Sequence, residues 1–340
     1  MKNKAFGLDI GQNTIKAVWL STETNGFFLD SATAIPTPAK GMLSESPLDQ
    51  EEMAQAIQTM VKDANITTKN VNVALPESQV YTRVIQMPLL SDKELLSAIY
   101  WEAEQYIPVP LTTITLDYKV LRRPDKPEDG GKMDVLLVGA PTVLIDKYEK
   151  VLSLAGLVIA SVETEILSTI RSVAIGDTYP PTLVVSIGAV STSLAIVKNS
   201  IILFTYSIPT GGIAITRAIA ASFGFALQQA EEYKKTYGIL QESLGGKVGQ
   251  AAQPILSLIL SEIKKALAFY QEKGKDSPIA QIVLTGGSSR LPGLPTYITG
   301  AVGIESVIAN PWKILVSQEV SKEILDDAAS YTVAVGLAMR

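Results

Sequence analysis

Two short segments of the chain share one pattern of apolar and polar positions. Residues 6–20 read FGLDIGQNTIKAVWL, and residues 183–197 read LVVSIGAVSTSLAIV. Each has an apolar run, a glycine followed by small or hydroxyl residues, and a second alternating apolar run, which is typical of a β-hairpin. Unless this match is due to chance, a hairpin in each half of the chain predicts two related domains that face each other. The alignment pairs Asp9 with Ser186, Gly11 with Gly188, and Thr14 with Ser191.

The remaining pattern predicts helices and strands that alternate, as in an α/β protein. Residues 91–94 form a capping box, which predicts a helix from there to about Tyr106, where Pro108 and Pro110 end it. The same reading gives strands at 113–121, 134–139 and 282–284, and helices at 142–155, 251–273 and 331–340.

Length and composition narrow the chemistry that the chain can perform. Its 340 residues are enough for two domains, each with its own core. A net charge of −5 argues against nucleic acid as a partner, because nucleic-acid binding needs a basic surface. The chain has no cysteine and no histidine, which excludes disulfides, zinc and haem sites, thiol nucleophiles and histidine bases. Any catalysis would have to use carboxylates, hydroxyls, lysines, backbone amides or a magnesium ion.

The sequence contains no segment that would carry the chain into a membrane. Residues 1–4 run directly into an apolar alternation, without the apolar stretch and cleavage site of a signal peptide. No window reaches the roughly 18 uninterrupted apolar residues of a membrane span. We therefore expect a cytoplasmic protein with no direct membrane insertion, which reaches a membrane only through another molecule.

Three turns that contain glycine follow apolar strands and are candidates for phosphate binding. Glycine lets the backbone come close to a ligand, so that its amides can surround phosphate oxygens. Asp9 could hold Mg²⁺ through water, and Lys16 could offer its charge to a phosphate. Each signal alone is weak, because a glycine after a strand is more often only a turn, and the chain has no GxxxxGKS, GxxxxGKT or strand-GxGxxG motif. The turns are Asp9-Ile10-Gly11, Ser186-Ile187-Gly188 and Thr285-Gly286-Gly287.

In this order, the turns resemble those of the actin-like ATPase superfamily, which includes actin, heat-shock chaperone ATPases, sugar kinases and the cell-division protein FtsA. The resemblance implies an α/β fold of the ribonuclease H-like kind, duplicated into two lobes with inserted subdomains and with ATP between the lobes. The matching motifs are phosphate loops at 7–16 and 183–193, connecting segments at 161–167 and 331–340, and an adenosine motif at 282–291. The implied subdomains are 1–82, 154–180 and 325–340 (first lobe core), 83–153 (its insert), 181–212 and 278–324 (second lobe core), and 213–277 (its insert).

Two longer stretches resemble one family of this superfamily, the PilM proteins of type IV pilus assembly. Residues 87–121 match its Met-Pro, acidic helix, E-x-E-Q-Y-I-P and following strand, and residues 208–235 match its Gly-Gly helix and A-E-x-x-K motif. The resemblance covers nearly the whole chain and implies ATP and Mg²⁺ as cofactors. It implies Asp9 and Glu165 as candidate catalytic residues, with Asp9 also serving the metal through water. The implied nucleotide-binding residues are Gly11, Gln12, Asn13, Thr14, Lys16, Gly188, Ser191, Thr192, Gly211, Gly212, Glu231, Lys234, Gly286, Gly287, Ser288 and Arg290.

One position departs from the family pattern. The second phosphate loop normally reads Asp-Ile-Gly, and here it begins with Ser186. Serine cannot supply a carboxylate to the water shell of the metal or orient an attacking water by charge, whereas Asp9 and the phosphates could still hold Mg²⁺. The sequence therefore predicts nucleotide binding with slow or absent hydrolysis, unless Ser186 is simply a strand-end residue without catalytic meaning.

The family resemblance also implies a protein partner at the inner membrane. PilM proteins capture the cytoplasmic N-terminal tail of the membrane protein PilN beside the inserted subdomain, and other pilus platform proteins are further candidates. Aromatic side chains suit such a role because they give large contact areas at low entropic cost, although ordinary core packing would also explain each of them. The protein would then be cytoplasmic and peripheral to the inner membrane through PilN. The expected groove residues are Tyr100, Trp101, Gln105 and Tyr106.

Two other functions use the same fold, since a fold does not fix a function. A small-molecule kinase would need an acidic general base between the lobes and larger subdomains for its substrate. Ser186 stands in place of an aspartate and the inserts are compact, so both features argue against a kinase. A filament-forming protein like FtsA would carry a C-terminal amphipathic membrane anchor, whereas this sequence stops at Arg340 inside its closing helix.

Overall fold

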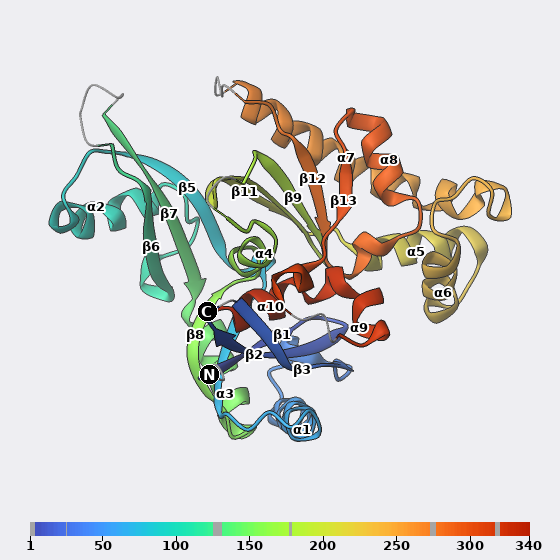
Figure 1. Ribbon diagram of the computed structural model, residues 1–340, viewed down its shortest axis with the longest axis horizontal. Helices are drawn as coiled ribbons and strands as arrows, with labels where there is room; N and C mark the ends of the chain where they lie inside the picture. The colour runs from blue at the N-terminus through green and yellow to red at the C-terminus, as the bar shows by residue number, and fades with distance from the viewer. Residues whose placement is uncertain (1–3, 25, 125–130, 177–178, 273–276, 317–319) are drawn as a thin grey trace.

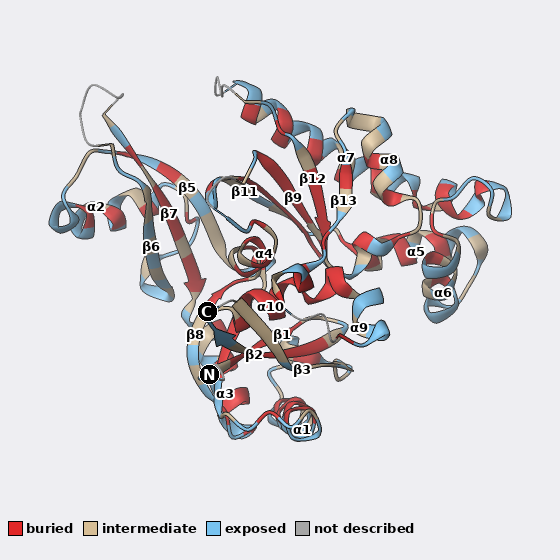
Figure 2. Ribbon diagram, in the orientation of Figure 1, coloured by how far each residue is buried: buried red, intermediate tan, exposed pale blue. Residues whose placement is uncertain are grey.

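The computed structural model describes residues 4–24, 26–124, 131–176, 179–272, 277–316 and 320–340 (Figure 1). Within these residues the chain forms three β-sheets, two with five strands and one with three. Figure 2 shows that buried residues concentrate in the central strands and in the closing helix. None of the described helices has both the length and the apolar composition needed to cross a bilayer.

The first sheet has the strand order β3-β2-β1-β4-β8. Its first three strands form an antiparallel meander, and β4 and β8 extend it in parallel from β1. Helices α1 (Pro47–Asp63) and α3 (Thr142–Leu154) bury apolar side chains such as Ile57 and Tyr148 against one face. The strands are β1 (Ala5–Ile10), β2 (Thr14–Glu23), β3 (Gly26–Pro36), β4 (Asn70–Leu75) and β8 (Val158–Thr164).

The second sheet repeats this plan with the order β11-β10-β9-β12-β13. Again three antiparallel strands are followed by two parallel ones, so the predicted duplication is confirmed. Helices α5 (Gly212–Phe223), α6 (Leu227–Tyr237), α7 (Lys247–Glu272) and α8 (Leu294–Val302) cover one face. The strands are β9 (Thr182–Ile187), β10 (Thr192–Lys198), β11 (Ile201–Ile208), β12 (Gln281–Thr285) and β13 (Ser306–Ile308).

The third sheet is antiparallel, with the order β5-β7-β6, and lies on the left in Figure 1. Helix α2 (Asp92–Glu104) packs Leu95 and Ile99 onto one face of it. The predicted capping box is confirmed, because Ser91 Oγ accepts from Glu94 N while Ser91 N donates to Glu94 Oε2 (2.8 Å). The strands are β5 (Tyr81–Pro88), β6 (Ile114–Arg122) and β7 (Lys132–Pro141).

Helices α4 (Glu165–Val173) and α10 (Thr332–Ala338) lie between the two five-stranded sheets (Figure 1). Helix α4 packs against the second sheet, and α10 packs against the first sheet and against α4. The two helix backbones touch at Gly336, where a Cβ atom would lie 1.9 Å from the carbonyl oxygen of Ser168. Glycine at this position therefore allows the closing helix to reach its place. A short helix, α9 (Lys322–Asp326), precedes α10.

Two arginines, Arg171 and Arg340, pair with one buried carboxylate and connect the end of α10 to β8 and α4. Glu163, which is 9% exposed on β8, accepts two hydrogen bonds of 2.6 Å from Arg171 on α4. Arg171 also donates to Gly336 O (2.7 Å), and Arg340 donates to Glu163 (3.0 Å). Paired, hydrogen-bonded charges of this kind are the form in which a carboxylate can be buried.

The helices and strands predicted from the sequence are present, with shifted ends. Helix α7 begins at Lys247 rather than at 251, because Val248 and Ala252 continue its buried face toward the N-terminus. Residue 273, where this helix was expected to end, lies outside the described residues. Strand β7 is longer than predicted, because it pairs along both edges. The division of the chain into four subdomains stays a prediction.

Candidate functional site

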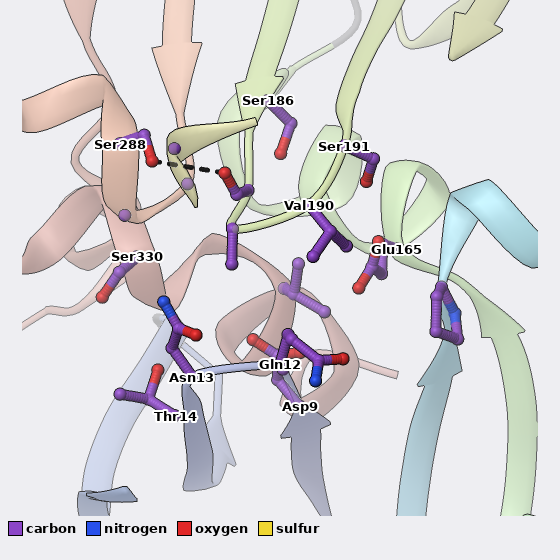
Figure 3. Close-up of a pocket in the computed structure, with 18 of the residues that line it drawn as sticks. Asp9, Gln12, Asn13, Thr14, Glu165, Ser186, Val190, Ser191, Ser288 and Ser330 are labelled. Carbon is purple, nitrogen blue, oxygen red and sulfur yellow. Dashed lines mark hydrogen bonds between the residues drawn. The ribbon is translucent and has the colours of Figure 1, made fainter. Parts of the chain in front are cut away.

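A cavity of about 650 Å³ is lined by residues of both halves of the duplication (Figure 3). Its walls come from the β1–β2 turn, the β9–β10 turn, the turn after β12 and the starts of α4 and α5. Small-molecule sites in proteins typically measure about 300–1,000 Å³. The cavity is therefore large enough for a ligand of nucleotide size.

The β1–β2 hairpin lines the cavity with the residues of its turn and with one lysine of β2. Gly11 N donates to Thr14 O (3.1 Å), which closes the turn. Lys16 lies opposite Asp9 in the strand register, and its Nζ donates to Thr14 Oγ1 (2.6 Å). Burial raises the pKa of Asp9, and the charge of Lys16 opposes this rise. This hairpin thus places one buried acid and one buried lysine at the cavity wall.

The β9–β10 turn has the same shape but different chemistry. Gly188 N donates to Ser191 O (2.9 Å), as in the first turn, and Gly212 N at the start of α5 donates to Gly188 O (2.9 Å). Where the first hairpin carries an acid opposite a lysine, this one carries Ser186 opposite Ser193. The second hairpin therefore offers hydroxyl groups where the first offers charges.

A buried lysine on α6 forms another wall. Lys234 Nζ lies 2.6 Å from the carboxylate of Glu231 and donates to Thr216 Oγ1 (3.0 Å) and Gly212 O (3.2 Å). Burial lowers the pKa of Lys234, although Glu231 opposes the shift. Burial alone would raise the pKa of Glu231, but hydrogen bonds from Lys234 and Thr216 lower it overall. The network holds a fixed set of polar groups beside the cavity.

The turn after β12 places the backbone of two glycines, Gly286 and Gly287, at the cavity wall. Gly286 has a φ of 80°, and a Cβ atom there would lie 2.6 Å from Ile187 O, so only glycine fits. The 3-10 helix η6 (Gly287–Arg290) follows directly. Ser288 Oγ donates to Gly188 O (3.2 Å, dashed in Figure 3), which joins this turn to the β9–β10 turn.

Two buried acids meet on the opposite side. Glu77, on the 3-10 helix η2 (Glu77–Gln79), donates its backbone N–H to Glu165 Oε2 (3.2 Å), while Ile166 N donates to Glu77 Oε2 (3.4 Å). Burial, followed by the charge of Asp9, raises the pKa of Glu165 to about 8. Burial also raises the pKa of Glu77. Glu165 is thus largely protonated at neutral pH, and perturbed acids in a cleft are typical of functional sites.

A family model described as Type IV pilus assembly protein PilM matches residues 7–340. The chain belongs to the PilM family. A solved structure of a PilM–PilN type IV pilus biogenesis complex is similar to it along its whole length. That structure has 30% sequence identity and a TM-score of 0.86, and the match covers 99% of this chain and 98% of the other.

Two further relatives support the fold that PilM proteins were expected to have. The cell division protein FtsA of Streptococcus pneumoniae serotype 2 is 26% identical over 341 residues, which cover 88% of this chain and 73% of FtsA. The crystal structure of MreB5 of Spiroplasma citri bound to ADP has a TM-score of 0.55 and 12% sequence identity, and the match covers 98% of this chain and 94% of MreB5. At this identity the similarity shows the fold alone. The predicted actin-like ATPase fold is confirmed.

Most residues that the PilM resemblance implies for the site line the cavity. Thr192 does not, because it is buried and its Oγ1 donates to Thr210 O (2.7 Å). Gly211 packs beneath the β9–β10 turn, where a Cβ atom would lie 2.7 Å from Gly188 O. The implied site residues that do line the cavity are Asp9, Gly11, Gln12, Asn13, Thr14, Lys16, Glu165, Gly188, Ser191, Gly212, Glu231, Lys234, Gly286, Gly287, Ser288 and Arg290.

Sequence motifs do not mark several other residues of the cavity wall. Tyr148 comes from α3, and Asp327, before α10, forms an ion pair with Arg290 (2.6 Å). Residues 76–79 follow β4 directly, and ligands of α/β sheets bind beyond the carboxyl ends of the strands. If this rule is applied to β4, the sequence alone predicts that residues 76–79 lie at the site.

The residues predicted to bind a partner lie away from the cavity, on and after α2. Trp101 is 74% exposed, Tyr100 56% and Leu96 58%, and we call these three exposed side chains of α2 the α2 surface. Tyr106 is half-buried, and the Arg83 guanidinium lies 4.7 Å from its ring centre. Gln105 is exposed beside it. Exposed clusters of large apolar side chains are typical of interaction sites.

A magnesium ion would depend on the nucleotide for most of its ligands. Among the described residues, no group of three or more acidic side chains could hold a metal by itself. Mg²⁺ beside a nucleotide needs only one or two protein carboxylates, since phosphates and water supply the rest. Asp9, a single buried acid at the cavity next to the β1–β2 turn, fits that requirement. The ion would there neutralise phosphate charge.

Proposed function

We propose that this PilM protein is an ATP-binding cytoplasmic scaffold of type IV pilus assembly. It captures the N-terminal cytoplasmic tail of a PilN protein, is held at the inner membrane by that partner, and hydrolyses ATP slowly or not at all. The observation that carries the proposal is the whole-chain similarity to a PilM structure solved with PilN.

The nucleotide part of the proposal rests on the cavity. Backbone amides of the β1–β2 and β9–β10 turns can receive phosphate oxygens, and the lysines Lys16 and Lys234 supply positive charge beside them. Asp9 would hold the hydrated Mg²⁺ that accompanies ATP. The related fold of MreB5, solved with ADP, is consistent with this use of the cleft.

Slow hydrolysis follows from the second hairpin, and it gives a testable prediction. We expect the Ser186→Asp variant to hydrolyse Mg·ATP faster than the wild type by roughly tenfold or more, because a carboxylate there can orient water and assist proton transfer. Released phosphate under saturating ATP measures the rate. Ser186→Ala serves as the control and should hydrolyse at the wild-type rate. An unchanged rate in Ser186→Asp, with nucleotide binding intact, would contradict this account.

A short segment connects the cavity to the partner-binding part of the molecule. Pro76, Ser78 and Gln79 line the cavity, and Glu77 between them is hydrogen-bonded to Glu165. The chain then runs directly into β5, a strand of the sheet that carries α2. We propose that nucleotide in the cavity shifts this segment and so changes the affinity for the PilN tail.

The experiment that tests the proposal is isothermal titration with a synthetic peptide. The peptide is the cytoplasmic N-terminal tail of the PilN-like protein of the same genome. We expect stoichiometric binding, weakened roughly 30-fold in Trp101→Ala, since an aromatic anchor contributes about 2 kcal/mol or more. Tyr106→Ala should also weaken it. Leu258→Ala, which removes an exposed apolar side chain of α7, is the matched control and should bind normally.

The outcomes separate the parts of the proposal. Absence of peptide binding, with and without Mg·ATP, would overturn the scaffold function. Normal binding by Trp101→Ala would move the peptide site away from the α2 surface. Equal affinities with ATP, with ADP and without nucleotide would rule out the coupling through residues 76–79.

A further inference from the structure

Tyr148 carries a hydroxyl group that the protein buries without giving it a partner. Its side chain extends from α3 into the core of the first lobe and is fully buried. Among the described residues, no group forms a hydrogen bond with its hydroxyl oxygen. Buried polar atoms in native proteins are nearly always hydrogen-bonded, because leaving one unpaired is costly. Seven buried side-chain atoms among the described residues have no such partner, and of the residues that carry them only Tyr148 lines the cavity, where a ligand could supply the partner that the chain does not.

The position of this hydroxyl indicates where that partner would come from. Tyr148 lines the cavity together with Asp9 and Glu165. Burial is the main cause that raises the pKa of its phenol, so the group keeps its proton. A protonated phenol in this place can donate to an oxygen atom that enters the cavity.

The proposed nucleotide binding supplies such an oxygen. Mg²⁺ bound with a nucleotide keeps several waters, and Asp9 would hold the ion through one of them. Tyr148 lies outside all three glycine turns, so no sequence motif assigns it to the site. We propose that the Tyr148 hydroxyl is a ligand-binding group of the cleft, which donates a hydrogen bond to metal-bound water beside Asp9 when Mg·nucleotide is present. The inference rests on the proposed nucleotide binding.

The Tyr148→Phe variant tests the proposal, because it removes the hydroxyl and keeps the ring. Dissociation constants for ADP are measured by titration with Mg²⁺ and with EDTA, and the melting temperature of the ligand-free protein is recorded. We expect the Mg²⁺-dependent gain in affinity to fall about fivefold, the value of one hydrogen bond. Affinity in EDTA should not change, and the ligand-free protein should melt at or slightly above the wild-type temperature.

A second variant provides the contrast. Tyr270 is also buried, but its hydroxyl donates to Ser277 O (3.0 Å) and it does not line the cavity. Tyr270→Phe should lower the melting temperature and keep the wild-type Mg²⁺ dependence. The inference is overturned if Tyr148→Phe keeps the full Mg²⁺ gain, or if it melts several degrees lower, which would mean that the hydroxyl already has a partner in the ligand-free protein. If the wild type binds no nucleotide, the nucleotide part of the proposed function fails and this inference fails with it.

Discussion

Replacement of Gly336 by alanine is expected to lower the free energy of unfolding by roughly 3 kcal/mol or more. A Cβ atom at this position would lie 1.9 Å from Ser168 O, and real Cβ contacts essentially never fall below 3.0 Å. Helices α4 and α10 would have to separate by about 1 Å. That movement would also strain the Arg171 hydrogen bond to Gly336 O and the Ser168 Oγ bond to Val333 O. Urea unfolding followed by tryptophan fluorescence measures the loss.

The matched control for this substitution lies on another helix. Gly300 is an exposed residue of α8, and a Cβ atom there would meet nothing within 4 Å. Gly300→Ala should stabilise the protein by about 0.5–1 kcal/mol, because alanine loses less backbone entropy in a helix than glycine does. If the two variants unfold at the same urea concentration, the α4–α10 contact is not as close as described.

The second large effect is expected in ligand binding rather than in stability. Gly287 lines the cavity, and a Cβ atom there would meet no protein atom within 4 Å. We therefore expect the side chain of Gly287→Val to leave the fold intact. If the cavity holds a nucleotide, that space is taken by the ligand, and overpacking of about 1–3 kcal/mol corresponds to roughly 5- to 150-fold weaker binding. Titration with Mg·ATP or Mg·ADP measures the change.

Gly287→Val is informative only if stability is recorded with it. The melting temperature of the ligand-free variant should equal that of the wild type within a degree or two. Gly300→Val, which places the same side chain outside the cavity, should leave the affinity unchanged. Wild-type affinity in Gly287→Val would place the nucleotide elsewhere.

Much of the fold can be predicted from the sequence because its signals are local. The two hairpins show alternating apolar residues on either side of a glycine, and both close with the same backbone hydrogen bond, from Gly11 to Thr14 and from Gly188 to Ser191. The start of α2 is encoded within four residues by its capping box. The glycine turns of the cavity are equally local, so their residues can be identified without a structure.

The parts of the site that the sequence does not reveal depend on contacts between distant segments. Tyr148 fits the apolar face of a helix, and nothing in that pattern tells a core tyrosine from one whose hydroxyl reaches a cavity. The high pKa of Glu165 results from burial and from Asp9, which comes from another element. Thr192 belongs to a phosphate-loop motif but is buried and faces Thr210 instead, because a motif names residues without giving their side-chain direction.

The position of α10 determines which half of the protein can complete its fold first during synthesis. The first sheet begins at residue 5, but the face formed by Val18 and Leu20 is covered by Trp312, Tyr331 and Val335, which follow the whole second sheet in the chain. The strands of the second sheet lie between residues 182 and 308, and helix α4, which packs against this sheet, precedes them in the chain. Domains usually fold in the order in which they emerge. Here the half that emerges first is completed by a helix that follows the second half in the chain, so the nascent chain exposes an unfinished apolar face of the first sheet while the second half is made.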